Sequence, residues 1–272
     1  MTSNQPPTFL AKKNPHPRDE NISFEEGPHI YTVLGERGTY TSVTTWNHSH
    51  FAKFDSDAIL DKMMKGKNIK DPKNKYYGMS REEIQAMWDQ KRDSSSSAGT
   101  KMHYDIECYY NNEPSNNDSV EYSYFMKFVK EYPDLVAYRT EWMIYEEDLK
   151  LSGSIDMIFE NPDGTLTIAD WKRVTEIQYE NNFNNMAITP CISHLPDTNF
   201  WHYALQLNVY KAILERKYGK TVKELYLVVL HPENCNKSYE KVDIPIMTKE
   251  IMDLFDMRRR QVESGDYAVK KH

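Results

Sequence analysis

The segment between residues 137 and 171 constrains the fold most, because it has the pattern of three consecutive β-strands. Three runs rich in β-branched and aromatic residues fill it: 137–145, 153–159 and 165–171. Asn161-Pro-Asp-Gly164 has the composition of a tight turn between the last two runs. Helical spacing over 200–217 and an apolar run at 224–231 follow, so we expect a further strand after a helix. The sequence therefore predicts an α/β fold with a mixed central β-sheet flanked by helices.

The patterns of the remaining segments predict a flexible N-terminal tail and several shorter helices and strands. Residues 1–22 are polar and rich in proline, so we expect a flexible N-terminal tail. A β-hairpin is expected from 29–33 and 40–44, and Ser80 with Glu83 has the pattern of a capping box that opens a helix. Further predictions are a break of that helix at 94–99, helices at 55–64, 100–110, 119–132 and 249–263, and a short strand at 242–246.

The length of 272 residues suits one large domain, expected over 23–272. We divide it into an N-terminal hairpin and helical part (23–98), a catalytic core (99–231) and a C-terminal strand and helix (232–272). No apolar run approaches the ~20 residues that span a bilayer, and the N-terminus lacks a signal-peptide pattern. We therefore expect an intracellular protein, in the cytoplasm, the nucleus or a viral replication site, that is not secreted and does not bind membranes.

Charge and cysteine content exclude some classes of protein. A net charge of -7 argues against a protein that coats nucleic acid through bulk charge, but it permits a local basic path beside an acidic site. The basic loop 65–79 is a candidate for such a path, and the irregular stretch 175–198 for a cap over the site. Three widely spaced cysteines, without a C-x-x-C pattern, argue against a disulfide framework and fit a reducing compartment.

The chemistry centres on Asp170-Trp-Lys172 at the end of a predicted strand. Alternate side chains of a strand share a face, so Asp170 and Lys172 point the same way and Trp171 points opposite. The hairpin can bring Asp156 beside Asp170. Two carboxylates and a lysine are suited to phosphodiester hydrolysis with Mg²⁺ or Mn²⁺, and the Trp171 backbone carbonyl is a further possible ligand. Taken alone, an Asp-x-Lys at a strand end is more often a solvated salt bridge.

Other candidate site residues are informative only in combination with Asp170 and Lys172. His103 offers an imidazole ligand, although a lone histidine is more often structural, and Glu107 lies one helical turn later on the same face. Glu141 either faces the same site or is an exposed strand residue. Gln206 and Tyr210 share a helix face and could contact phosphate, a base or the lysine, although a tyrosine half-buried against the sheet is the simpler reading.

Taken in order, these residues resemble the RecB-type branch of the PD-(D/E)XK nucleases. That branch includes the RecB nuclease domain, CRISPR adaptation nucleases and the mitochondrial genome maintenance exonuclease. The resemblance spans about 99–231, with a similar start at 41–45. The matching motifs are Gly99-Thr-x-x-His103-x-x-x-Glu107, Glu141, Gly153-x-x-Asp156, Asp170-x-Lys172 and Gln206-x-x-x-Tyr210. Each is short, and their order on the expected elements makes them specific. The resemblance implies a restriction-endonuclease-like core.

The resemblance also implies roles for individual residues. The implied metal ligands are His103, Asp156, Asp170 and the Trp171 carbonyl, holding one or two Mg²⁺ or Mn²⁺ ions. The implied catalytic residues are Lys172, which acts on the attacking water, with Asp170, Asp156 and Glu141. Glu107 would support the ligands, and the implied DNA-binding residues are Gln206 and Tyr210, to which we add Arg173 beside the site. Ile155 replaces the usual proline, and Asp170 replaces a glutamate. Three cysteines cannot build the four-cysteine iron–sulfur cluster of some relatives, so none is expected.

The expected function is hydrolysis of DNA, by an exonuclease acting on linear or single-stranded molecules in replication, repair or recombination. The expected partners are single-stranded DNA or duplex ends, and a helicase or other replication or recombination protein, because the chain has no nucleotide-binding P-loop motif of its own. Two alternatives stay open: an RNA endonuclease of the cap-snatching type, and an inactive nucleic-acid-binding protein with the nuclease fold.

Overall fold

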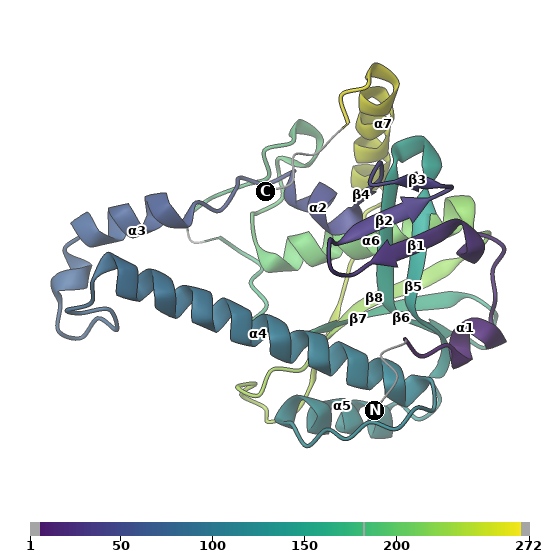
Figure 1. The fold of residues 1–272 in the computed structure, drawn as a ribbon, viewed down its shortest axis with the longest axis horizontal. Helices are drawn as coiled ribbons and strands as arrows, with labels where there is room; N and C mark the ends of the chain where they lie inside the picture. Colours follow the sequence, from purple (N-terminus) through teal and green to yellow (C-terminus); the bar gives the residue numbers. More distant parts are fainter. Residues whose placement is uncertain (1–5, 182, 268–272) are drawn as a thin grey trace. The chain divides into compact units, whose positions relative to one another are not determined.

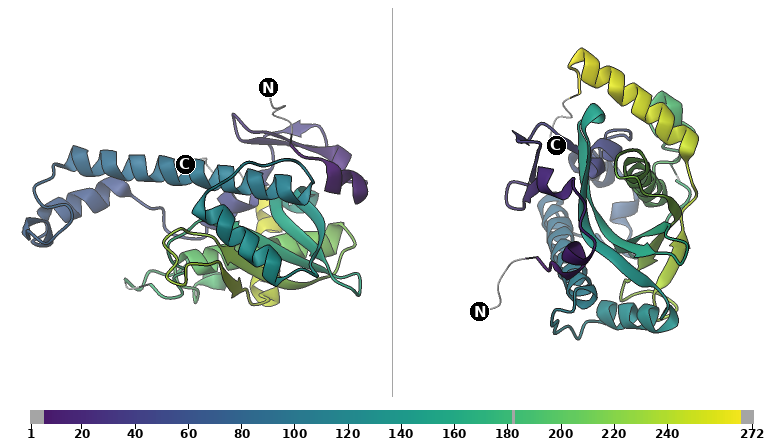
Figure 2. Two further views of the ribbon diagram at one scale, coloured as in Figure 1. Left: turned by 90° about the horizontal axis from the view of Figure 1, so that it is seen from below. Right: turned by 90° about the vertical axis from the view of Figure 1, so that its right-hand side faces the viewer.

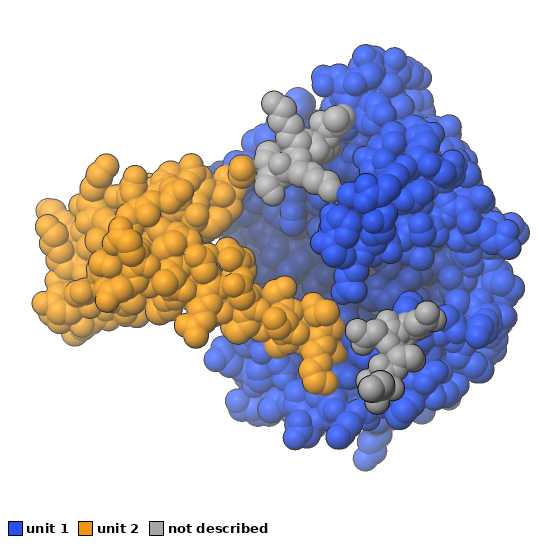
Figure 3. Space-filling view, viewed as in Figure 1, with its two compact units in different colours: residues 1–52, 103–272 blue, residues 53–102 orange. Residues whose placement is uncertain are grey.

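The computed structural model describes residues 6–181 and 183–267. The chain forms two compact units, one from residues 1–52 and 103–272, which we call the main unit, and the other from residues 53–102, which we call the insert (Figure 3). Helix α4 (Arg81–Tyr110) contributes residues to both. The sequence pattern predicts one domain over 23–272, which stays a prediction, and within it the insert has a small core of its own.

A mixed β-sheet forms the centre of the main unit (Figure 1). Its strands are β4 (Thr41–Ser42), β5 (Val136–Glu146), β6 (Leu151–Glu160), β7 (Leu166–Lys172), β8 (Val222–Val229) and β9 (Glu240–Asp243). Strands β5, β6 and β7 pair antiparallel, β8 joins β7 in parallel, and β9 pairs antiparallel with β8. The predicted α/β class with a mixed central sheet is therefore confirmed.

The turn between β6 and β7 forms where its residues predict it. The backbone N–H of Asn161 donates to the Thr165 carbonyl at 2.8 Å, and that of Gly164 donates to the Asn161 carbonyl at 2.9 Å. Gly164 has a φ of +77°, a conformation that glycine adopts without steric cost. This turn sets the register of β6 against β7, from Glu160–Leu166 to Met157–Ala169.

Helices cover the sheet on both faces, as Figures 1 and 2 show for the main unit. Helix α6 (Asn199–Lys217) packs its apolar face, including Leu205 and Leu214, into the main core with Ile158 and Ile168. Trp171 points away from that core, and its ring lies 5.5 and 5.6 Å from the rings of Phe125 and Phe128 on α5 (Val120–Glu131). Helix α7 (Thr248–Ser264) completes the main unit, with short 3-10 turns at Glu147–Leu149 and Pro190–Ile192.

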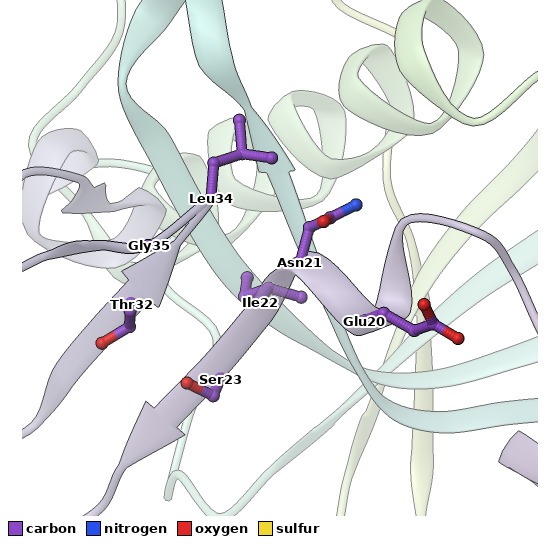
Figure 4. A pocket seen from close by; sticks show the side chains of 7 residues that line it. All are labelled: Glu20, Asn21, Ile22, Ser23, Thr32, Leu34 and Gly35. Atoms are coloured by element: carbon purple, nitrogen blue, oxygen red, sulfur yellow. The ribbon is translucent and has the colours of Figure 1, made fainter.

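The N-terminal strands depart from the predicted hairpin. Strands β1 (Ile22–Glu25), β2 (Ile30–Val33) and β3 (Glu36–Arg37) form a separate three-stranded sheet. Residues 41–42, expected to pair with 29–33, instead form β4 beside β6, and helix α2 (Val43–His48) follows at once. The Ser42 hydroxyl accepts the Thr45 backbone N–H at 3.1 Å, so a helix cap forms where the pattern suggests a continuing strand. A small pocket of about 180 Å³ lies on this sheet. Figure 4 shows the residues that line it, among them Asn21 and Thr32.

Residues 6–22 are more ordered than the predicted flexible tail, while residues 1–5 of that prediction lie outside the described residues. Helix α1 (Phe9–Lys13) buries Leu10, whose backbone N–H donates to the Asn111 side chain at 2.9 Å. Arg18 forms an ion pair with Glu147 at 2.6 Å, and Asp19, in the 3-10 turn Asp19–Asn21, accepts the Trp142 indole N–H at 2.8 Å. These contacts tie the segment to β5, to the 3-10 turn that follows it and to the end of α4, which a polar composition does not reveal.

The insert contains helix α3 (Ser56–Lys65), the 3-10 turn Asn68–Lys70 and the start of α4. The predicted capping box is present: the Ser80 N–H donates to the Glu83 carboxylate at 2.7 Å and the Glu83 N–H to the Ser80 hydroxyl at 3.2 Å. The predicted break at 94–99 is wrong, because α4 runs through it without interruption. Serines and one glycine weaken a helix by only ~1 kcal/mol or less each and lack the steric clash of a proline.

One further prediction concerns the stretch between β7 and α6. Residues 175–181 and 183–198 are largely irregular as expected, apart from the 3-10 turn Pro190–Ile192 and an isolated bridge between Met186 and Pro196, and they bury the side chains of Ile177 and Leu195. Their predicted role as a cap stays a prediction.

Among the described residues, no helix has the length and apolar character needed to cross a membrane.

Candidate active site

An unpaired stretch of β6 creates the site. Strand β6 pairs with β5 along its length, so β4 and β7 must share its other edge. β4 pairs with Leu151 and Ser152, and β7 pairs only from Met157 onward. In the part of the chain that the structure describes, residues 153–156 have no strand partner on this edge, although β7 continues to Lys172. Polar side chains at the ends of this gap therefore meet beside unpaired backbone.

Three predicted residues of the main unit, His103, Glu141 and Asp156, converge where this gap ends at Asp156. The Asp156 Oδ2 atom accepts the Trp171 backbone N–H at 3.1 Å and lies 3.4 Å from His103 Nδ1. Glu141 Oε1 lies 3.9 Å from the same nitrogen. Ligand atoms of His103, Glu141 and Asp156 all fall within 4.8 Å of one another. One imidazole and two carboxylates at this spacing could hold a divalent metal ion.

The backbone of Glu141 adopts an unusual conformation that accompanies its place in this cluster. Its φ is +42° in the middle of β5, a left-handed conformation that is uncommon for residues other than glycine. Regular pairs flank it, Thr140 with Met157 and Trp142 with Ile155. The Ser154 hydroxyl donates to Glu141 Oε2 at 2.9 Å. Such strain costs about 1–3 kcal/mol and persists where neighbouring structure enforces it, often at functional sites.

Asp170 and Lys172 form the second part of the site. Lys172 Nζ lies 2.5 Å from Asp170 Oδ2 and 4.7 Å from the centre of the Tyr203 ring. Asp170 is buried, and Trp171 between them faces α5. The three-residue cluster thus differs from the expected ligand set, because it contains Glu141 and leaves Asp170 beside the lysine. For Trp171 the structure shows a backbone N–H contact with Asp156, and the role of its carbonyl stays a prediction.

The electrostatics of the site favour an added cation. Burial raises the pKa of the Asp156 and Asp170 carboxyls, that of Asp170 to about 6, and the neighbouring Asp156 adds to the shift of Asp170. Burial lowers the pKa of His103, but Asp156 and Glu141 outweigh it and raise the value to about 9. Burial and the Glu141 charge raise the pKa of Glu107 to about 7. The raised carboxyl pKa values show that negative charge is crowded in this site, and a bound cation would offset that charge, so this donor set fits a divalent metal.

Gln206 and Tyr210 lie on α6 as predicted and are joined by a hydrogen bond. The Gln206 amide donates to the Tyr210 hydroxyl at 3.2 Å. Tyr210 is buried, and a Cβ atom added at Gly153 would lie 2.7 Å from its Cε1 atom. The close approach explains why glycine stands at the start of Gly153-x-x-Asp156: only a residue without a side chain leaves room for the ring. The DNA-binding roles of Gln206 and Tyr210 stay predictions.

Arg173 is engaged elsewhere in the main unit. Its Nε atom lies 2.6 Å from Glu121 Oε1 on α5, and both side chains are largely buried. The role of Arg173 in DNA binding also stays a prediction. The sequence interpretation did not include Tyr203, whose ring lies beside the Lys172 ammonium. Its position three residues before Gln206, on a similar face of the helix, is the signal that could have identified it.

Comparison with known proteins adds little to this geometry. No protein-family model and no curated protein matches the chain. One solved structure that matches is a "putative exonuclease" from Eubacterium rectale, at 13% sequence identity and a TM-score of 0.30, covering 57% of this chain and 72% of that one. A likeness this distant carries no argument about activity, and the function depends on what the site residues themselves can do.

Proposed function

We propose that this chain is a divalent-metal-dependent nuclease of the RecB-type PD-(D/E)XK kind that hydrolyses phosphodiester bonds in DNA. The observation that carries the proposal is the convergence of His103, Glu141 and Asp156 where the β6 gap ends, with the Asp170–Lys172 pair on the neighbouring strand β7. Chance Asp-x-Lys sequences at strand ends make solvated salt bridges. Here Asp170 is buried and Lys172 is mostly shielded from solvent, and an imidazole and two more carboxylates accompany the pair.

The residues that would hold the metal are His103, Glu141 and Asp156, with Asp170 as a further carboxylate. Mg²⁺ and Mn²⁺ both suit oxygen ligands, and an imidazole is more usual for Mn²⁺. A bound divalent ion would polarise the scissile phosphate and lower the pKa of a water molecule. Asp156 is fixed for this role because the Trp171 backbone N–H holds its carboxylate across the gap.

Lys172 contributes a positive charge to the site in addition to that of a bound metal ion. Burial lowers the pKa of its ammonium, but Asp170 and Asp156 outweigh burial and raise it, so the group stays protonated at neutral pH. A fixed ammonium beside the carboxylates can orient the attacking water or stabilise the charge that develops on the phosphate. Tyr203 packs beside the ammonium and restricts its position.

A cleavage assay on several nucleic acids tests the proposal. Linear and circular DNA, single-stranded and duplex, and RNA are incubated with Mg²⁺, Mn²⁺ or EDTA. We expect cleavage of linear or single-stranded DNA with either metal and none in EDTA. Products from circular DNA would indicate an endonuclease, and cleavage of RNA alone would favour the cap-snatching alternative. If Mn²⁺ binds and no nucleic acid is cut, the nuclease proposal is wrong.

Metal affinity is expected to rise with pH, by up to about tenfold per pH unit for each proton released. His103, with a pKa of about 9, and Asp170, with a pKa of about 6, must lose their protons before they can bind a cation. Binding therefore strengthens as the pH rises from 6 towards 9. Calorimetric titration with Mn²⁺ in two buffers of different ionisation enthalpy measures the protons released. His103→Gln should release fewer protons, and an affinity that does not change with pH would contradict the assignment.

A further inference from the structure

The insert carries a dense group of lysines around the end of α3 and the loop that follows. Between residues 62 and 75 there are six lysines and one aspartate: Lys62, Lys65, Lys67, Lys70, Lys73, Lys75 and Asp71. All six lysines are exposed. The whole chain carries a net charge of -7, so the positive charge of this segment is opposite in sign to the net charge of the protein. We call the six residues the lysine cluster.

The lysine cluster is not neutralised by its own unit. Within residues 6–181 and 183–267, none of the six ammonium groups forms an ion pair with a carboxylate. Both arginines of the insert do: Arg81 pairs with two aspartates of α3, and Arg92 with Asp89 and Asp93. The carboxylate of Asp71 accepts the Lys73 backbone N–H at 2.9 Å. The acidic residues of the insert therefore leave the lysine charges available to an external anion.

Structural roles account for only part of the cluster. Lys62 and Lys65 lie in the last turn of α3, where a cation stabilises the helix dipole. Lys67, Lys70 and Lys73 have no such role. The core beneath them consists of Leu60, Ile69, Tyr76 and Ile84, with Met63, Met64, Met79 and Trp88 packed around it. Because the lysine side chains take no part in this core, their charge can be removed without unfolding the insert.

An exposed aromatic ring accompanies the lysines. Tyr77 is 54% exposed, although its neighbour Tyr76 is buried and accepts the Trp88 indole N–H at 2.8 Å. Lys75 Nζ lies 4.6 Å from the centre of the Tyr76 ring. Unpaired cations that can follow a phosphate backbone, together with a free aromatic face on which a base can stack, are the features that bind single strands. A duplex would meet the cations but would offer no unstacked base to the ring.

We propose that the lysine cluster and Tyr77 form a binding surface for single-stranded DNA, separate from the residues that carry out hydrolysis. The choice of a nucleic acid as ligand rests on the proposed function. The lysines contact backbone phosphates, and Tyr77 stacks on an unpaired base. Binding at this surface supplies substrate affinity and its dependence on salt, and leaves the chemical step unchanged.

The test compares two triple variants with the same change in net charge. K67Q/K70Q/K73Q removes unpaired lysines of the cluster. K223Q/K241Q/K249Q removes lysines of the main unit that are each paired with an aspartate. Binding of a labelled single strand to the full chain is measured by fluorescence anisotropy in EDTA over a range of salt concentrations, so that no cleavage occurs.

The cluster variant is expected to bind single strands about tenfold or more weakly, with the slope of log affinity against log salt reduced by about 2. The control variant should stay within about twofold of wild type. Tyr77→Ala should weaken binding about fivefold or more, and Tyr77→Phe should restore it. The proposal is overturned if the cluster variant binds single strands like the control, or if the wild-type protein binds duplex of the same sequence equally well. Binding to anionic lipid vesicles is measured in parallel, and a cluster variant that loses only vesicle binding also overturns the proposal.

These results separate the binding surface from the proposed function. A protein that cleaves DNA but whose cluster variant binds like the control disproves the binding surface and leaves the nuclease proposal standing. A protein that binds single strands through the lysines and cuts no nucleic acid with any metal disproves the nuclease proposal alone.

Discussion

Replacing Lys172 with alanine is expected to slow DNA cleavage by about 10²–10³-fold, the usual effect of removing one fixed charge or donor at a reacting centre. The ammonium lies 2.5 Å from Asp170 Oδ2, in the cluster that would bind the phosphate. No other lysine or arginine among the described residues forms an ion pair with Asp156 or Asp170, so none can replace it. Single-turnover cleavage of a labelled strand, with enzyme in excess, measures the chemical step.

The substitution also leaves Asp170 buried without its cation, so stability needs a separate control. Lys172→Met keeps most of the side-chain volume, and its thermal unfolding shows whether the fold survives. Mn²⁺ binding should persist in both variants, because the proposed ligands His103, Glu141 and Asp156 are unchanged. Lys249→Ala removes an exposed lysine and should cut at the wild-type rate. Cleavage by a folded Lys172 variant within about threefold of wild type would remove this residue from the chemistry.

Local patterns predicted the strands of the site well. Period-two alternation placed Asp170 and Lys172 on one face of β7 and Trp171 on the other, and the Asn161–Gly164 turn fixed the register against β6. These features depend on residues close in sequence, whose preferences act over a few positions. The same reasoning placed α5, α6 and α7 to within a few residues.

Long-range pairing was not predictable in the same way. Residues 41–42 join β6 in parallel, although their sequence fits a local hairpin, because the free edge of β6 is created by strands more than a hundred residues later. The position of Glu141 depends on a φ of +42° that only the surrounding pairs enforce. The independent core of 53–102 brings together side chains from α3 and α4, which no single periodic segment shows.

Gly153→Ala is expected to destabilise the fold by about 1–3 kcal/mol, the usual cost of overpacking a core. The new Cβ would lie 2.7 Å from Tyr210 Cε1 and 3.0 Å from its hydroxyl oxygen. A buried, rigid ring cannot move aside as the end of a flexible side chain would. Either α6 or β6 must shift, and urea unfolding measures the cost.

Gly99→Ala is the matched control for stability. A Cβ at Gly99 meets nothing within 4 Å, and the residue lies inside α4. Alanine is favoured over glycine in a helix by about 1 kcal/mol, so this variant should be stabilised rather than destabilised. Opposite signs for the same chemical change would show that the approach of Tyr210 causes the effect at Gly153.

Cleavage should fall together with stability in Gly153→Ala, by about 10²-fold, because a shift of about 1 Å misplaces reacting groups. Gly153 begins the unpaired stretch that ends at Asp156, so displacement of β6 would directly move a proposed metal ligand. In a Tyr210→Ala background the ring is absent. Gly153→Ala should therefore lower the free energy of unfolding less in that background than it does in the wild-type protein. If the two substitutions are simply additive in stability, Gly153 and Tyr210 do not act through this contact, and the glycine has another role.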